Sequence, residues 1–204
     1  SLTGTPTGSF ASKNVANGIT VNVSGLSLTG AQAGNYSLTA PTLSANITAK
    51  SLTSVGTLTA SNKVYDATTN AASTILSITN IQGSDTVNLA SGTATLASAN
   101  VGSRAISSVG TLALGNNSAG DYTLSGAAGS VTINARALTI TAAANTKVYD
   151  GTTTASTLPT ITSGALQGSD TANFTESYGA RTVGATMALT PAGTVNDGNS
   201  GNNY

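Results

Sequence analysis

The sequence has no histidine, no cysteine and no tryptophan among its 204 residues. Without histidine and cysteine, Ser-His-Asp and Cys-His nucleophilic catalysis are excluded, and so are zinc sites built on these side chains. The lack of cysteine also excludes a disulfide framework. We therefore expect a protein that is not an enzyme, with no catalytic residues, no cofactor and no metal ion.

Charged side chains are also scarce, at 7% of the residues against roughly 25% in an ordinary soluble domain. Seven Lys and Arg balance seven Asp and Glu, so the formal net charge is zero. Seven scattered cations do not form the basic patch that nucleic-acid binding requires. No apolar run approaches the ~18 residues that span a bilayer. We expect neither nucleic-acid binding nor membrane insertion.

The abundant residues are Thr, Ser, Ala, Gly and Asn, which favour strands and turns over helices. Ile19, Val21 and Val23 alternate with polar residues, which is the period of a half-buried strand. The same alternation predicts strands at Val131 to Ile133 and at Leu138 to Ala142. Short strands at this spacing predict an all-β fold made of small antiparallel β-sandwich modules.

Internal repetition with a period of about 85 residues is the strongest feature of the sequence. Three landmarks recur in a fixed order: a Lys-Val-Tyr-Asp segment, a Gln-Gly-Ser-Asp-Thr segment and a segment ending in Asn-Tyr or Asp-Tyr. They are Lys63–Asp66 and Lys147–Asp150, Gln82–Thr86 and Gln167–Thr171, and Asn35–Tyr36, Asp121–Tyr122 and Asn203–Tyr204.

These landmarks divide the chain into three parts. Residues 1–49 are the C-terminal half of one repeat, residues 50–135 are a complete repeat, and residues 136–204 are a repeat that lacks its last strand. We interpret the chain as a window of a longer array with an open strand edge. Only four residues separate Ile133 from Leu138, so the seam is short and a semi-rigid, rod-like array is expected.

The ordered landmarks resemble the YDG-type repeat and its MBG relatives. The resemblance covers nearly the whole chain. It rests on the segments Lys147–Thr153, Gly168–Asp170, Lys13–Val15, Leu26–Gly30 and Gly34–Leu38. These repeats occur in tandem in large bacterial surface and secreted adhesins, including filamentous-haemagglutinin-like exoproteins. The resemblance implies an extracellular β-rich module, related to Ig-like or β-grasp folds, that serves as a stalk. It brings no catalytic residues with it.

One position departs from the Tyr-Asp-Gly pattern, because the middle repeat has Ala67 where the third has Gly151. If this position needs a positive φ, Ala67 carries strain of about 1 kcal/mol. We favour the alternative, in which the position adopts a right-handed conformation and glycine is only a preference.

The tyrosines allow two readings. Tyr65 and Tyr149 are either a platform for a ligand or structural residues whose rings pack and whose hydroxyls bond backbone. We favour the structural reading for both, and for Tyr36, Tyr122 and Tyr204, because each recurs at one place in the repeat.

The few charged residues can also be interpreted as structural. Asp85 and Asp170 are expected to cap turns through Asx-type bonds, and a calcium site is the sharper alternative. Lys50 and Arg136 lie at the seams and are expected to make interdomain contacts or to be solvated. Lys63 and Lys147 could each form an intramolecular isopeptide bond to an Asn.

Three functions from different classes follow. The leading hypothesis is a stalk or fibre segment of a bacterial cell-surface or secreted adhesin, which projects a binding tip and supports adhesion and biofilm. Its expected partners are neighbouring repeats of the same chain, then like fibres and matrix polysaccharide. The alternatives are a fibre subunit completed by strand donation from another chain and a polysaccharide-binding module.

Overall fold

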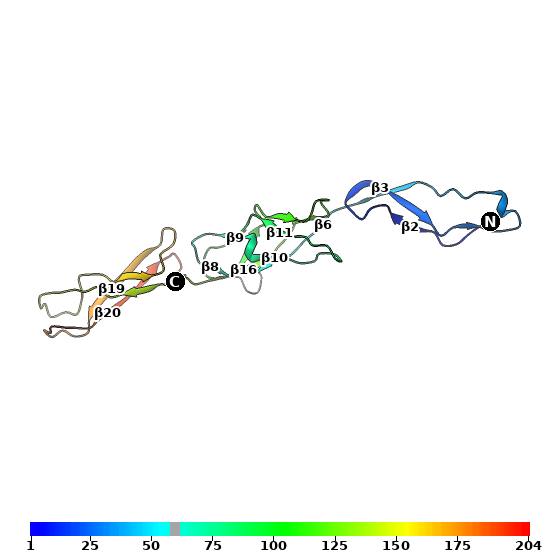
Figure 1. Cartoon of the computed structure of the whole chain (residues 1–204). Helices are drawn as coiled ribbons and strands as arrows, with labels where there is room; N and C mark the ends of the chain where they lie inside the picture. The colour runs from blue at the N-terminus through cyan, green and yellow to red at the C-terminus, as the bar shows by residue number, and fades with distance from the viewer. Residues whose placement is uncertain (58–61) are drawn as a thin grey trace. The chain divides into compact units, whose positions relative to one another are not determined.

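The computed structural model is all-β and describes residues 1–57 and 62–204. Strands and loops make up the described chain, and two single 3-10 turns are its helical elements: η1 (Ala33–Asn35) and η2 (Ser73–Ile75) (Figure 1). Among the described residues, no helix has the length and apolar character needed to cross a membrane. The predicted all-β class is confirmed.

The strands of the first predicted repeat form two small antiparallel sheets. One pairs two short strands, and the other has the order β2-β3-β5. In the central strand, Ile19 is buried and Val21 and Val23 are half-buried, while the residues between them are exposed. The strands are β1 (Leu2–Thr3), β2 (Thr7–Phe10), β3 (Ala16–Ser24), β4 (Ser27–Leu28) and β5 (Leu43–Ile47).

The strands of the middle repeat include a five-stranded sheet with the order β8-β16-β13-β12-β9. The strands between residues 50 and 135 are β6 (Lys50–Ser51), β7 (Val55–Thr57), β8 (Lys63–Val64), β9 (Asn70–Ala72), β10 (Leu76–Ile78), β11 (Asn88–Ser91), β12 (Thr93–Leu96), β13 (Gly102–Ser108), β14 (Ala113–Gly115), β15 (Tyr122–Thr123) and β16 (Ser130–Asn134).

The core of the five-stranded sheet follows the alternation seen in the sequence. In β16, Val131 and Ile133 are buried and the three residues around them are exposed. Leu96 of β12 and Ala71 of β9 complete the same core. Burial of these apolar side chains is the main term that stabilises such a sheet. The predicted strand at Val131 to Ile133 is confirmed.

The third repeat contains two antiparallel pairs, β17 with β18 and β19 with β20. The second pair is the longest among the described residues, and its eight-residue strands lie side by side (Figure 1). The strands are β17 (Thr139–Thr141), β18 (Thr160–Ser163), β19 (Thr171–Tyr178) and β20 (Leu189–Asn196).

Two strand pairs correct the expectation of purely antiparallel sheets. β15 pairs with β6, and β16 pairs with β8, in parallel. The two strands of each pair lie about 70 residues apart in the sequence. They are therefore not joined by a hairpin, which would make them antiparallel, and the long connection lets the second strand run in the same direction as the first. Both pairs lie where the predicted repeats adjoin.

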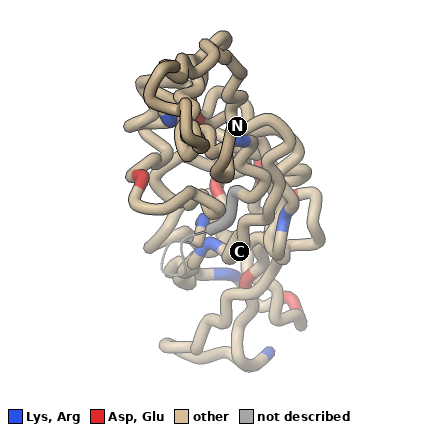
Figure 2. The backbone as a smooth tube through the Cα atoms, turned by 90° about the vertical axis from the view of Figure 1, so that its right-hand side faces the viewer, with Lys and Arg blue, Asp and Glu red and all other residues tan. Residues whose placement is uncertain are grey.

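The chain forms two compact units, each of which contains one seam between predicted repeats. Unit 1 consists of Ser1–Thr53, Thr79–Asn88 and Leu114–Ala127, and unit 2 of Ser54–Ile78, Leu89–Ala113 and Ala128–Tyr204. The middle repeat therefore contributes to both units. The charged residues are few in both, as Figure 2 shows.

Candidate functional site: the junctions between repeats

Residues from neighbouring repeats meet at two junctions. Junction 1, in unit 1, joins the first and middle repeats through Lys13, Val15, Lys50, Asp85, Asp121 and Tyr122. Junction 2, in unit 2, joins the middle and third repeats through Tyr65, Val101, Arg136, Asp170, Asn203 and Tyr204.

The Gly-Ser-Asp turn of each junction is tied to a tyrosine by the same two hydrogen bonds. In junction 1, Tyr122 donates to the Oδ2 atom of Asp85 over 2.7 Å and accepts from the Gln82 N–H over 3.0 Å. In junction 2, Tyr204 donates to Asp170 over 2.8 Å and accepts from the Gln167 N–H over 2.7 Å. Each hydroxyl is therefore both donor and acceptor, which fixes the turn to the tyrosine loop.

The residue before each tyrosine makes the contact that crosses between repeats. The Val15 N–H donates to Asp121 Oδ1 over 2.6 Å, and the Val101 N–H donates to Asn203 Oδ1 over 3.0 Å. The backbone carbonyl of the same residue accepts the N–H of the seam residue. These bonds are Lys50 to Asp121, at 2.8 Å, and Arg136 to Asn203, at 2.9 Å.

The loop that contains the donor valine, Val15 or Val101, has the same local hydrogen bond at both junctions. The Asn14 N–H donates to the Ser12 hydroxyl and the Asn100 N–H to the Ser98 hydroxyl, each over 3.1 Å. These local bonds hold the loop in one shape, so the following valine N–H is presented outward. Both the valine loop and the tyrosine loop that it contacts are therefore the same at the two junctions.

The junctions differ in what else the aspartate binds. In junction 1, the Lys13 ammonium lies 2.8 Å from Asp85, and this hydrogen bond and the one from Tyr122 lower the pKa of Asp85. In junction 2, Ala99 stands where the first repeat has Lys13, and the hydroxyl of Tyr65 donates to Asp170 over 2.9 Å instead. The aspartate therefore has a second donor at each junction.

Tyr65 is the most enclosed tyrosine of junction 2, with 3% of its surface exposed. Its ring meets the ring of Tyr204 edge-on, with centroids 5.5 Å apart. Its carbonyl accepts a 2.8 Å hydrogen bond from the Arg136 Nε atom. Burial, and next the hydrogen bond to Asp170, raise the pKa of Tyr65 to about 12.

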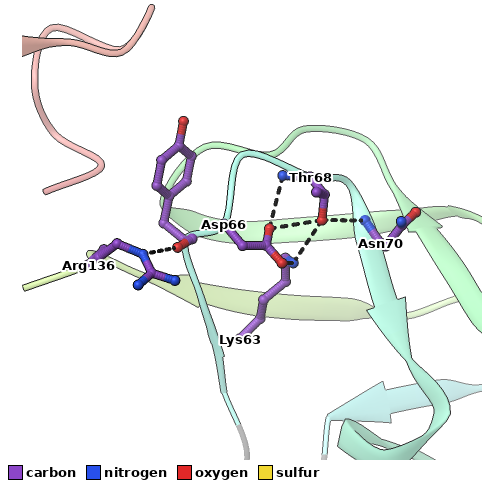
Figure 3. Close-up of polar contacts among 6 residues, drawn as sticks. Lys63, Asp66, Thr68, Asn70 and Arg136 are labelled. Atoms are coloured by element: carbon purple, nitrogen blue, oxygen red, sulfur yellow. Dashed lines mark hydrogen bonds and ion pairs between the residues drawn. The ribbon is translucent and has the colours of Figure 1, made fainter. Parts of the chain in front are cut away.

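The segment around Tyr65 is held by a compact polar turn (Figure 3). The Lys63 ammonium contacts the Asp66 carboxylate and the Thr68 hydroxyl, and Asp66 also accepts the Thr68 N–H and hydroxyl. Burial disfavours the Asp66 charge, but the bonds from Lys63 and Thr68 outweigh it and lower its pKa. In the third repeat, Lys147, Asp150 and Thr152 repeat this arrangement.

The structure answers several of the alternatives for the charged residues. Asp85 and Asp170 do not cap their own turns through Asx bonds; their carboxylates bind tyrosine hydroxyls, and turn closure comes from backbone bonds to Gln82 and Gln167. Lys63 and Lys147 pair with aspartates, not with Asn. Arg136 makes the expected contact between repeats. Among the described residues, no group of three or more acidic side chains could hold a metal ion.

Ala67 has a φ of +60°, and Gly151 has a φ of +77°. The favoured expectation of a right-handed conformation at this position is therefore wrong, and the left-handed one is required. The cause is the turn itself, because the Asp66 carboxylate bonds backbone two residues later and the chain must reverse within that span.

The structural reading of the tyrosines holds for three of the five. Tyr65 and Tyr122 are buried, and Tyr204 is half-buried, but Tyr36 and Tyr149 are 72% and 65% exposed. In addition, the buried hydroxyls bond a carboxylate rather than backbone acceptors. The alternation and the repeat did not reveal this division, because it depends on which partner each ring meets in the folded chain.

Sequence reasoning missed three buried polar residues. Asn203 is fully buried, although it was read only as a repeat landmark. Asp197 accepts backbone N–H groups from Asn199, Gly201 and Asn203; burial opposes its charge, but these donors lower its pKa. Glu176 of β19, which is the only glutamate of the sequence, accepts a hydrogen bond from the Ala143 N–H. Its uniqueness in so uncharged a sequence was the available signal.

An all-β chain whose repeats are fastened by the same loop contacts is a tandem-repeat β protein. A comparison with protein-family models found the YDG domain, which matches residues 1–44, 48–130 and 134–204. The chain belongs to the YDG domain family, as its motifs suggested. Comparisons with curated proteins and with solved structures each found no match.

Proposed function

We propose that this chain is a segment of the stalk or fibre of a bacterial cell-surface or secreted adhesin, where it holds a binding tip away from the cell. The observation that carries the proposal is the recurrence of one set of hydrogen bonds at both junctions. A repeated contact between modules serves to set their spacing, which is what a stalk needs.

The short seams support the same proposal. Two residues separate β5 from β6, and four separate β16 from β17, so little flexible chain lies between repeats. In this proposal each repeat is a small β-sandwich-like module, related to Ig-like or β-grasp folds, in a rod-like array at the cell surface. The function is mechanical and assigns no catalytic step to the chain.

Small-angle X-ray scattering and multi-angle light scattering over a concentration series test the stalk. We expect a monomer with a radius of gyration well above the roughly 17 Å of a compact chain of this length. A matched variant has a flexible Gly-Ser insertion between Ala135 and Arg136. It is expected to show a smaller maximum dimension and a broader distribution of interatomic distances. A compact monomer that the insertion leaves unchanged would refute the stalk. Growth with concentration would instead support the subunit completed by strand donation.

Polysaccharide binding is the second candidate, and a specific observation favours it. Tyr149 is exposed in a groove of about 420 Å³, where a sugar ring could stack on it. The burial of Tyr65 counts against a platform repeated along the array. Calorimetric titration of the natural chain and of the Tyr149→Ala variant with cello-oligosaccharides tests this candidate. Binding to the natural chain that the substitution abolishes would support it.

A further inference from the structure

A single carboxylate oxygen holds two phenol groups at junction 2. The hydroxyls of Tyr65 and Tyr204 both donate to the Oδ2 atom of Asp170, over 2.9 and 2.8 Å. The two phenol oxygens therefore lie close to each other, and both hydroxyl hydrogens point at the same acceptor. This arrangement brings together the reactive ends of two side chains from different repeats.

The rings of the same two residues are also in contact. Their centroids lie 5.5 Å apart, and their planes are inclined by 76°. Tyr65 is 3% exposed and Tyr204 is half-buried, so the surrounding atoms limit the movement of both rings. The pair is thus held in one geometry in the folded chain.

This geometry matches the product that two tyrosines form on oxidation. A tyrosyl radical shares its unpaired electron between the oxygen and the ring carbons next to the carbon that bears it. Two such radicals couple at these carbons and give o,o′-dityrosine, in which both hydroxyls flank the new bond and the rings are twisted about it. At junction 2 the hydroxyls already converge on one point and the rings are inclined rather than stacked. Holding two reacting groups in this way favours their coupling.

We propose that Tyr65 and Tyr204 are a modification site, at which a one-electron oxidant joins the middle and third repeats through an o,o′-dityrosine cross-link. The oxidant is an external agent, namely hydrogen peroxide used by a haem peroxidase. The inference goes beyond the proposed function, because it concerns covalent chemistry at junction 2 and does not depend on the shape or the role of the array.

The reaction balances without a leaving group. Each phenol loses one electron and one proton, and the Asp170 carboxylate is the proton acceptor that both hydroxyls already contact. A carbon–carbon bond forms between the rings, and the hydrogen on each joined carbon moves to the oxygen of its own ring, which restores the hydroxyl. Hydrogen peroxide takes up the two electrons and the two protons and becomes two molecules of water.

The burial of Tyr65 does not prevent this reaction. The oxidant needs to reach only the half-buried Tyr204, because Tyr65 can pass an electron to the Tyr204 radical across the ring contact and its proton to Asp170. A second oxidation of Tyr204 then completes the pair of radicals. The cross-link makes the contact between these two repeats covalent, so denaturants cannot separate them at this point.

Junction 1 provides an internal comparison. Its aspartate, Asp85, accepts one tyrosine hydroxyl, from Tyr122, and its other oxygen accepts the Lys13 ammonium. Among the described residues, Tyr65 and Tyr204 are the one pair of aromatic rings in contact. We therefore expect a cross-link within the chain at junction 2 and none at junction 1.

The test oxidises the full chain at micromolar concentration with the tris-bipyridyl complex of ruthenium(II), persulfate and visible light. In this reaction persulfate takes up the two electrons and becomes two sulfate ions, and the protons go to the buffer. The monomer is then isolated, unfolded, digested with trypsin and analysed by mass spectrometry. Trypsin places Tyr65 alone in the peptide 64–104 and Tyr204 alone in the peptide 182–204.

The expected product is these two peptides joined, with a mass lower than their sum by two hydrogen atoms. Because the two rings are neighbours in one chain, this link is expected to exceed any other tyrosine pairing by about tenfold or more. Tyr65→Phe and Tyr204→Phe are each expected to abolish it. Tyr122→Phe is the matched control, since it removes the equivalent hydroxyl at junction 1, and it is expected to leave the yield unchanged. Circular dichroism establishes that each variant is folded.

An oxidised monomer that lacks the joined peptides would overturn the inference, and so would other tyrosine pairs formed as often. A yield that stays the same when the chain is oxidised in unfolding concentrations of urea would also overturn it, because the folded junction would then not be the cause. The same link found only in chains that have dimerised would reject it as well, since it would join two molecules rather than two repeats.

Discussion

The hydroxyl of Tyr65 in the middle repeat donates a 2.9 Å hydrogen bond to the carboxylate of Asp170, 105 residues further along the chain. The same carboxylate accepts the hydroxyl of Tyr204, whose ring packs against Tyr65. One acidic side chain thus links a residue of one repeat to the tyrosine loop of the next. The sequence has seven acidic residues, and this one accepts hydrogen bonds from two tyrosines.

Tyr65→Phe is expected to lower the free energy of unfolding by about 1 kcal/mol, since it removes a hydrogen bond to a charged acceptor and keeps the ring. Urea unfolding followed by circular dichroism measures the change. Tyr149→Phe is the matched control, because Tyr149 is 65% exposed, and is expected to leave stability within about 0.5 kcal/mol. Equal losses in the two variants would contradict the role given to the Tyr65 hydroxyl.

Asn203→Ala is expected to cost about 1–3 kcal/mol, because it leaves the Val101 N–H of junction 2 without its acceptor. The side chain is fully buried and also contacts Asn100. Hydrogen exchange of the Val101 amide gives a local readout and should become faster. Asn202→Ala, at the exposed neighbouring position, is the control and should leave that amide unchanged. Slow exchange in both variants would show that another group holds this amide.

Ala67→Gly is expected to stabilise the protein by about 1 kcal/mol, since Ala67 has a φ of +60° and glycine adopts this conformation without a steric cost. Gly151→Ala, at the equivalent position with a φ of +77°, is expected to destabilise by a similar amount. Thermal unfolding of both variants measures the two shifts. Opposite signs are required, and a loss of stability in Ala67→Gly would contradict the strain assigned to this turn.

Stability is expected to fall as the pH rises from about 10 to about 12. Burial, and next the hydrogen bond to Asp170, raise the pKa of Tyr65 from 10.0 to about 12. The folded chain therefore holds this proton more tightly than the unfolded chain, and the resulting stabilisation is complete below pH 10 and is lost toward pH 12. The advantage of the natural chain over Tyr65→Phe should shrink across this range in urea titrations. An advantage that does not change with pH would contradict the raised pKa.

Several features of the fold could be read from the sequence because they depend on local patterns. Alternation at Ile19 to Val23 and at Val131 to Ile133 predicted strands with one buried face, and both are present. The recurring landmarks predicted the family. Neither result needs knowledge of distant partners, since the period of a strand and the order of motifs are written along the chain.

The candidate site could be predicted only in part. Arg136 was expected to make interdomain contacts or to be solvated, and it makes the contact. Asp85 and Asp170 were expected to cap their own turns, and they bind tyrosines instead. An aspartate beside Gly-Ser has the same local pattern whether it binds its own backbone or a tyrosine 34 to 37 residues away. Local reasoning favoured a nearby backbone N–H as the donor, whereas in the folded chain a distant tyrosine hydroxyl is the donor.

The sequence by itself determined the β class, the repeat and its landmarks, because Thr-rich alternation and fixed motif order are properties of the chain. Only the tertiary structure decided the direction of the β8–β16 pair, the left-handed turn at Ala67 and the burial of Tyr65 against the exposure of Tyr149. Identical segments met different neighbours. The burial of a side chain depends on what packs against it in space, and the shared Lys-Val-Tyr-Asp segment does not specify that partner.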